Sequence, residues 1–159
     1  MQINIPKKED EKEPTRVKVI FPTSAYFLSG IRDFTLQIIK NMSGFSDQWA
    51  FRFQSVVDEL CNNAIEHGSA PNQEITLTFL INRDKKIEVT VEDTGTGIKP
   101  ITADELRKIF TEKSSQDPTE MHEIRGRGLS HIIGPLTDEI HFEDTTKGGI
   151  KIRVVKFFT

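Results

Sequence analysis

Three short segments of this chain carry residues that could bind a nucleotide together. The first is ELCNNA at residues 59–64, in which Glu59 and Asn63 stand one helical turn apart. A carboxylate can accept a proton, and a carboxamide oxygen is a suitable ligand for a divalent cation. This segment therefore pairs a group for proton transfer with a group for a metal ion.

The other two segments suit a flat ligand and a phosphate. EDTGTGI at residues 92–98 places Asp93 beside Gly95 and Gly97, which let the backbone approach a ligand closely. RGRGL at residues 125–129 precedes a predicted helix and supplies free backbone N–H groups and two arginines, which phosphates require.

Each segment also has an ordinary interpretation. A Glu/Asn pair at i and i+4 is common on solvated helix faces, Asp-x-Gly-x-Gly also builds turns and calcium sites, and Gly-Arg-Gly can be a loop before a helix. The order of the three segments, and their places after a helix, after a strand and before a helix, favour a common site.

In that order, the segments resemble the N, G1 and G2 boxes of the GHKL ATP-binding fold, which gyrase-type ATPases, histidine kinases and anti-sigma serine kinases share. The resemblance covers roughly residues 16–158. The anti-sigma-factor serine/threonine kinases are the most similar branch, because they are short and combine Glu-x-x-x-Asn-Ala with a compact Gly-x-Gly-Leu.

The resemblance implies a role for each site residue. Glu59 would be the general base, Asn63 would hold Mg²⁺, and Asp93 would accept a hydrogen bond from the adenine amine of ATP. The remaining nucleotide-binding positions would be Gly95, Gly97, Ile98 (an apolar wall), Arg125, Gly126, Arg127, Gly128 and Leu129. The family often has Gly-Gly-Thr in its last hairpin, where the threonine helps to hold the base, whereas this chain has Ile150 after two glycines.

The same resemblance implies a function. The expected protein is an ATP- and Mg²⁺-dependent serine/threonine kinase that phosphorylates a STAS-domain anti-anti-sigma partner, sequesters a sigma factor and forms a homodimer. Two alternatives stay open: an ATP-binding switch module that transfers nothing, and a simple ATPase in which Glu59 activates water.

Composition narrows the classes of partner. The net charge of −3 and the lack of a sustained Lys/Arg stripe argue against direct binding of nucleic acid. No apolar run approaches the ~20 residues that span a bilayer, and no signal peptide is recognisable, so we expect a cytoplasmic protein without membrane contact. The single cysteine, Cys61, is expected to be an inert core thiol.

Periodicity predicts the elements that position the three segments. We expect strands at 17–21, 75–81 and 87–91, a final hairpin joining 140–142 to 150–157, and helices at about 24–43, 47–66, 102–110 and 129–136. The polar residues 111–123 are expected to form a lid.

These elements predict an α+β two-layer sandwich, in which helices cover one face of a mixed or antiparallel sheet, the Bergerat-type ATP-binding fold of the resembled family. Residues 1–14 are expected to be a loosely ordered tail or an edge strand, and residues 15–159 a single ATP-binding kinase domain.

Overall fold

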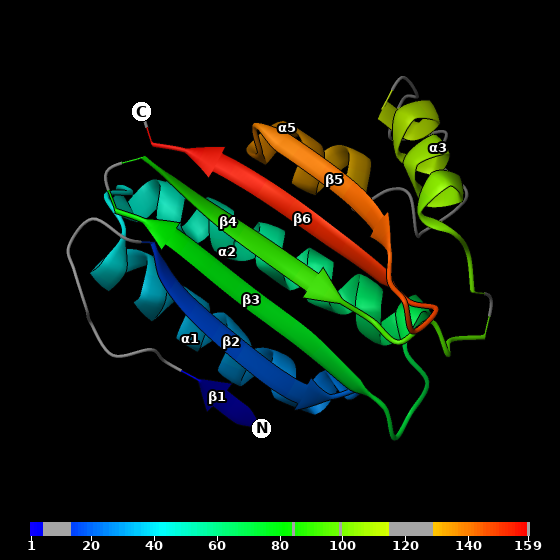
Figure 1. The fold of residues 1–159 in the computed structure, drawn as a ribbon. Coiled ribbons are helices and arrows are strands. Elements are labelled where there is room, and N and C mark those ends of the chain that lie inside the picture. Colours follow the sequence, from blue (N-terminus) through cyan, green and yellow to red (C-terminus); the bar gives the residue numbers. More distant parts are fainter. Residues whose placement is uncertain (5–13, 84, 99, 115–128, 159) are drawn as a thin grey trace.

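A computed structural model shows a six-stranded sheet with its helices on one face (Figure 1). The structure describes residues 1–4, 14–83, 85–98, 100–114 and 129–158. Every neighbouring pair of strands is antiparallel, and the strand order is β1-β2-β3-β4-β6-β5. The predicted α+β sandwich is confirmed, and of the two sheet types that the sequence left open the antiparallel one is present.

The strands follow the predicted alternation. They are β1 (Gln2–Asn4), β2 (Thr15–Pro22), β3 (Glu74–Asn82), β4 (Lys86–Glu92), β5 (Glu139–Asp144) and β6 (Ile150–Phe157). In β3 the odd-numbered residues from Ile75 to Ile81 are buried, and the even-numbered ones are more accessible. Alternation of this kind gives the sheet one apolar face and one polar face. β1 pairs with the edge of β2, so residues 2–4 form an edge strand.

Two long helices cover the apolar face. They are α1 (Leu28–Met42), preceded by the short 3₁₀ helix η1 (Ala25–Phe27), and α2 (Asp47–Asn63), which continues as a π-helical turn, η2 (Ala64–Gly68). The core between helices and sheet contains fully buried side chains from both layers, among them Phe21, Ile39, Phe53, Leu60 and Phe79. Burial also raises the pKa of the Cys61 thiol, which is consistent with the expected inert core residue.

The remaining elements lie around β5. Helix α3 (Ala103–Ser114) is tied to that strand by the Arg107 guanidinium, which donates to the Phe142 carbonyl at 2.8 Å. The π-helical turn η4 (Leu129–Ile133) and the short α5 (Gly134–Leu136) lie on the helical side (Figure 1). No helix in the described residues is long and apolar enough to cross a membrane.

Two boundaries differ from the prediction. The α-type bonding of the second helix ends at Asn63 rather than near 66, because the next turn is π-helical. Helix α3 begins at the predicted cap, where Thr102 Oγ1 accepts the Glu105 N–H at 3.2 Å, but it runs to Ser114. Residues 111–114, which were predicted to begin the lid, are therefore part of this helix, and residues 115–123 lie outside the described residues.

The cap of α2 gives a stability test. The Ser46 hydroxyl accepts the Trp49 N–H at 3.2 Å, so Ser46→Ala should lower the free energy of unfolding by about 1 kcal/mol. Ser55→Ala is the matched control, because the Ser55 hydroxyl only donates to the Phe51 carbonyl within the same helix and its loss should cost at most about 0.5 kcal/mol. Urea unfolding measures both, and equal losses would contradict the capping role.

Candidate nucleotide site

Helix α2 carries the predicted general base, Glu59, and the predicted metal ligand, Asn63, on its last turns. Glu59 and Asn63 are both half-buried, while Leu60 and Cys61 between them are fully buried and fix the rotation of the helix. The spacing that the sequence predicted is therefore present on an anchored helix.

Glu59 holds its proton more tightly than an ordinary glutamate. Partial burial raises the pKa of its carboxyl above 4.5, and the negative charges of Asp58 and Glu66 raise this pKa further. Asp58 itself accepts two hydrogen bonds from the Arg32 guanidinium on α1, at 2.6 Å and 3.2 Å. A carboxylate with a raised pKa is better matched to proton transfer near neutral pH.

The carboxamide of Asn63 carries a buried hydrogen-bond acceptor. Its Oδ1 atom is buried and has no hydrogen-bond partner among the described residues. Buried polar atoms of this kind are rare, and a missing ion or water usually accounts for them. A carboxamide oxygen is a hard ligand of the type that Mg²⁺ prefers, so the residue fits the metal that the sequence predicted for it.

Asp93 lies at the end of β4 and is 6% exposed. Its Oδ1 accepts the backbone N–H groups of Gly95 and Ile150, both at 3.0 Å, and its own N–H donates to the Ile150 carbonyl at 3.1 Å. These bonds fix the carboxylate between the end of β4 and the start of β6.

Glycines surround this carboxylate. A Cβ atom on Gly68 would collide with the Asp93 carboxylate, and one on Gly149 would collide with the Asp93 carbonyl. Gly95 has a φ of 70° and lies against the Gly148 carbonyl, so a side chain there is excluded by both conformation and space.

A chain of hydroxyl groups joins the end of α2 to the loop after β4. The Ser69 hydroxyl accepts the Thr94 N–H and contacts the Thr94 hydroxyl, both at 3.0 Å. The Thr94 and Thr96 hydroxyls are 2.7 Å apart, and Thr96 Oγ1 accepts the Ala70 N–H at 2.9 Å. This chain ties the helix that carries Glu59 and Asn63 to the loop that follows Asp93.

The pocket beside Asp93 is narrow, with a cavity volume of about 10 Å³. Ile101 and Ile150 supply apolar side chains to its lining. The other lining residues are His67, Gly68, Asp93, Gly95 and Pro100. Ile98 was predicted to be part of this wall, but its side chain is 96% exposed. The backbone of Gly97 approaches the His67 carbonyl so closely that no side chain fits there, and the next residue points to solvent.

The predicted phosphate loop is only partly described. Leu129 is buried and begins η4, whereas Arg125, Gly126, Arg127 and Gly128 lie outside the described residues. The structure thus brings together the ends of α2 and β4 and the start of β6. The sequence did not single out Gly68, Ser69, Thr94, Thr96 or Gly149 as site residues, because only their contacts across the fold reveal them.

Substitution of Gly68 tests the cage around Asp93. Gly68→Ala would displace the carboxylate and break its bonds to Gly95 and Ile150, so nucleotide affinity should be lost and stability should fall by about 1–3 kcal/mol. Gly30→Ala is the control, because no atom lies within 4 Å of a Cβ at this position on α1. Alanine favours the helix over glycine there, so the free energy of unfolding should rise by about 0.5–1 kcal/mol. Calorimetry and urea unfolding check both variants.

Comparison with known families agrees with this geometry. The family described as "Histidine kinase-, DNA gyrase B-, and HSP90-like ATPase" matches residues 50–157, a range that runs from α2 to the end of β6. No curated protein matches the chain. The matched range is more than half of the chain and contains Glu59, Asn63, Asp93 and the glycines around Asp93. The chain therefore belongs to the histidine kinase-, DNA gyrase B- and HSP90-like ATPase family, whose ATP-binding domain it contains.

Proposed function

We propose that this chain is a serine/threonine protein kinase of the anti-sigma type, which transfers a phosphoryl group from ATP to a STAS-domain anti-anti-sigma protein. The observation that carries the proposal is the pair on α2. Glu59, with its raised pKa, stands one turn from the buried Oδ1 of Asn63, which accepts no hydrogen bond from any residue that the structure describes. A module that only binds Mg²⁺-ATP needs the carboxamide of Asn63, but it does not need a carboxylate that can accept a proton.

The residues that would hold Mg²⁺-ATP follow from the site. Asn63 would coordinate the metal through its carboxamide oxygen, and Asp93 would accept a hydrogen bond from the adenine amine. Magnesium, when bound, neutralises phosphate charge. The loop with Arg125, Gly126, Arg127, Gly128 and Leu129 is proposed for the phosphates on the strength of the sequence resemblance.

Glu59 would act on the acceptor hydroxyl. Its carboxylate takes the proton from the serine or threonine oxygen as that oxygen forms its bond to phosphorus, and ADP is the leaving group. The neighbouring Asp58 is not available as the base, because the Arg32 guanidinium donates hydrogen bonds to both oxygens of its carboxylate.

The partners in this proposal come from the resemblance to the anti-sigma kinases. The segment ELCNNA and a compact Gly-x-Gly-Leu support that branch, and they also support a sequestered sigma factor and a homodimer. Phosphorylation would change such a complex by adding negative charge to a contact surface of the STAS protein.

Transfer of radiolabelled phosphate from ATP to a co-encoded STAS protein tests the function. Glu59→Gln keeps the shape of the side chain but removes the proton acceptor, so ATP should still bind while transfer falls by about 10²–10⁴-fold. Asn63→Ala removes a metal ligand, so binding of Mg²⁺-ATP and transfer should fall together.

Two exposed positions provide matched controls for these variants. Glu74→Gln on β3 and Asn41→Ala on α1 make the same chemical changes outside the site and should transfer at the parental rate. No labelling of the partner and no ATP hydrolysis by the parental protein would show a binding module, and hydrolysis without labelling would show an ATPase. Labelling by Glu59→Gln at the parental rate would exclude Glu59 as the base.

The raised pKa of Glu59 also predicts a pH-dependent stability. The folded state disfavours the ionised form of Glu59, so ionisation of this carboxyl lowers the free energy of unfolding. This loss of stability is absent below about pH 4.5, where the carboxyl is protonated in both states, and is complete above the raised pKa of the folded state. Glu59→Gln should therefore be more stable than the parental protein at pH 7.5, and the difference should shrink as the pH falls toward 4.5. Urea unfolding at several pH values measures the difference. A constant difference across this range would contradict the raised pKa.

A further inference from the structure

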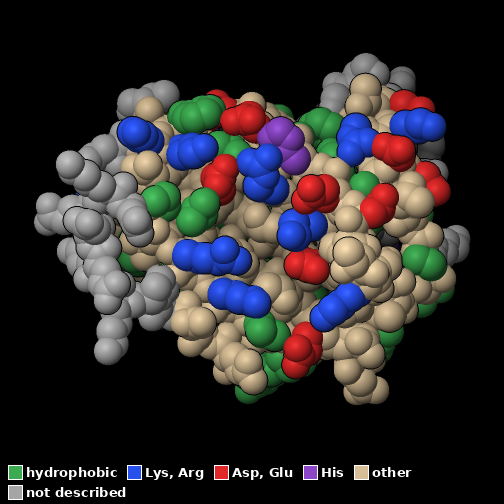
Figure 2. Space-filling model, in the orientation of Figure 1, with side chains coloured by type: hydrophobic (Ala, Val, Ile, Leu, Met, Phe, Trp, Pro, Cys, Tyr) green, Lys and Arg blue, Asp and Glu red, His purple; other side chains and the backbone are tan. Residues whose placement is uncertain are grey.

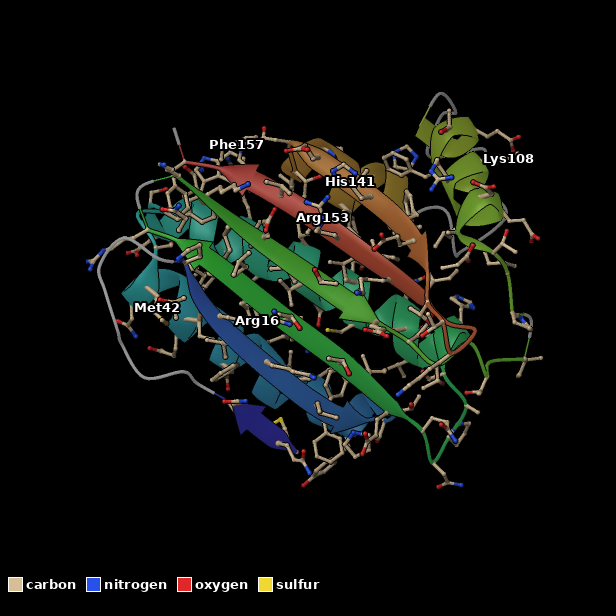
Figure 3. All side chains as sticks on the ribbon, viewed as in Figure 1. Arg16, Met42, Lys108, His141, Arg153 and Phe157 are labelled. Atoms are coloured by element: carbon tan, nitrogen blue, oxygen red, sulfur yellow. The ribbon has the colours of Figure 1, made fainter. Side chains whose placement is uncertain are left out.

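Helix α3 lies beside β5, at the opposite edge of the sheet from β1 (Figure 1). Figure 3 shows Lys108 on this helix and His141 on the strand. Apolar contacts hold the two elements together, since Leu106 is fully buried and the rings of Phe110 and Phe142 are 5.8 Å apart. The helix is therefore packed against β5 rather than free at the edge of the sheet.

The first residue of α3 is also bonded to the last residue of β5. The Asp144 carboxylate accepts the Ala103 N–H at 2.8 Å, across 41 positions of the sequence. The first N–H groups of a helix have no partner within the helix, so an acceptor from another element stabilises the helix end and also fixes its position. Asp144 thus links the end of β5 to the start of α3.

The residues directly before Ala103 form one wall of the pocket beside Asp93. Pro100 and Ile101 line this pocket, and residues 100–102, which we call the strap, belong to no helix or strand. The other lining residues belong to η2, to β6 or to the hydrogen-bonded cage around Asp93. The strap is therefore the wall of the pocket that regular secondary structure does not hold.

This wall must move before the pocket can hold a purine base. The cavity volume of about 10 Å³ is no more than one water molecule needs. After the base has entered, Ile101 can close on it only if the strap returns to a defined position. The bond from Asp144 fixes that position, because Ala103 is only two residues after Ile101.

The neighbouring strand holds the facing part of the pocket. Asp144 and Ile150 are register partners on β5 and β6, and the Ile150 N–H donates to Asp93 Oδ1 at 3.0 Å. Ile150 lines the pocket as well. The bond between Asp144 and Ala103 therefore places the strap relative to the same pair of strand ends that holds Asp93.

We infer that Asp144 is a positioning residue of the nucleotide pocket, whose hydrogen bond to the Ala103 N–H holds the strap so that Ile101 closes on the adenine base. Asp144 acts through the strap and not by contact with the nucleotide. The inference rests on the proposed position of adenine at Asp93, but it does not depend on phosphoryl transfer.

Calorimetry of the full chain with ADP and with a non-hydrolysable ATP analogue, each with Mg²⁺, tests the inference. Asp144→Ala removes the acceptor and should weaken both nucleotides by about three- to tenfold, the range that one hydrogen bond contributes. The two losses should be equal, because the strap lies at the base and not at the phosphates. Asp144→Asn keeps an oxygen that can accept the Ala103 N–H, so it should bind both nucleotides within twofold of the parental protein.

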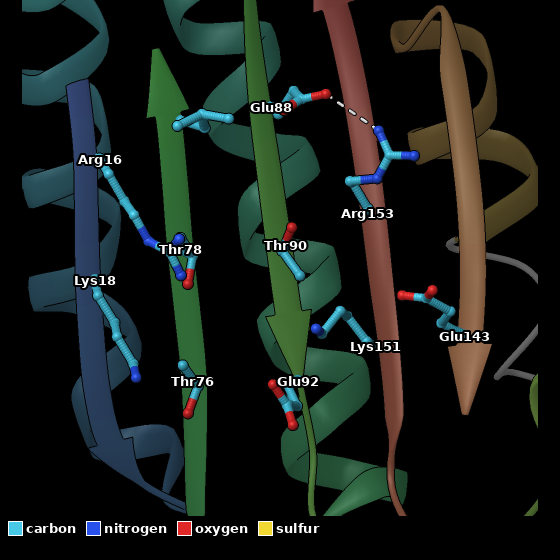
Figure 4. A pocket seen from close by; sticks show the side chains of 11 residues that line it. Arg16, Lys18, Thr76, Thr78, Glu88, Thr90, Glu92, Glu143, Lys151 and Arg153 are labelled. Atoms are coloured by element: carbon cyan, nitrogen blue, oxygen red, sulfur yellow. Dashed lines mark hydrogen bonds and ion pairs between the residues drawn. The ribbon is translucent and has the colours of Figure 1, made fainter. Parts of the chain in front are cut away.

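Two control variants separate positioning from charge and from stability. Glu143→Ala removes the same charge from the adjacent residue of β5, whose side chain lies on the open face of the sheet (Figure 4). Figure 2 shows that acidic and basic side chains are interspersed over this face. Ser46→Ala removes a capping bond at the other end of α2, and urea unfolding compares its loss of stability with that of Asp144→Ala. Both controls should keep the parental affinity within twofold.

Four results would overturn the inference while leaving the nucleotide site in place. They are parental affinity in Asp144→Ala, an equal loss in Asp144→Asn, an equal loss in either control, and a larger loss for the ATP analogue than for ADP, which would place the effect at the phosphates. Failure of the parental protein to bind either nucleotide would overturn the inference together with the proposed function.

Discussion

The carboxylate of Asp93 is the point on which the nucleotide site depends. Its Oδ1 joins the loop after β4 to the start of β6 through two backbone N–H groups, although Ile150 is 57 positions away in the sequence. Gly68, at the end of η2, packs against the same carboxylate. One acidic side chain thus contacts both the end of the helix with Glu59 and Asn63 and the adjacent strands β4 and β6.

Local patterns were sufficient to predict the strands and helices, because the period of the apolar residues marks which face of each element is buried. The alternation from Ile75 to Ile81 gave β3, and the spacing of Glu59 and Asn63 gave one face of α2. The cage around Asp93 could not be predicted in this way. Gly68 and Gly149 are 81 positions apart (149 − 68) and meet Asp93 only after the sheet and α2 have packed, so neither carries a local signal.

Ile98 illustrates the same limit. An isoleucine directly after Asp-x-Gly-x-Gly is a reasonable candidate for the wall of a base pocket, yet it is exposed, and Ile101 and Ile150 take that place. Gly97, directly before Ile98, lies in close contact with the His67 carbonyl of η2, a contact between residues that are distant in the sequence. Ile150, which stands where the resembled family often has threonine, contributes a backbone N–H to Asp93, a bond that does not depend on its side chain.

Successive side chains of a β-strand point to opposite faces of the sheet, so adjacent residues belong to different surfaces. Val91 enters the core while Glu92 faces the opposite side of the sheet, and Asp93 directly after them lines the pocket of the candidate nucleotide site. On β6, Ile150 bonds to Asp93 while Lys151 lies on the open face of the sheet. Because Glu92 and Lys151 are register partners, the two surfaces meet at one pair of strand ends.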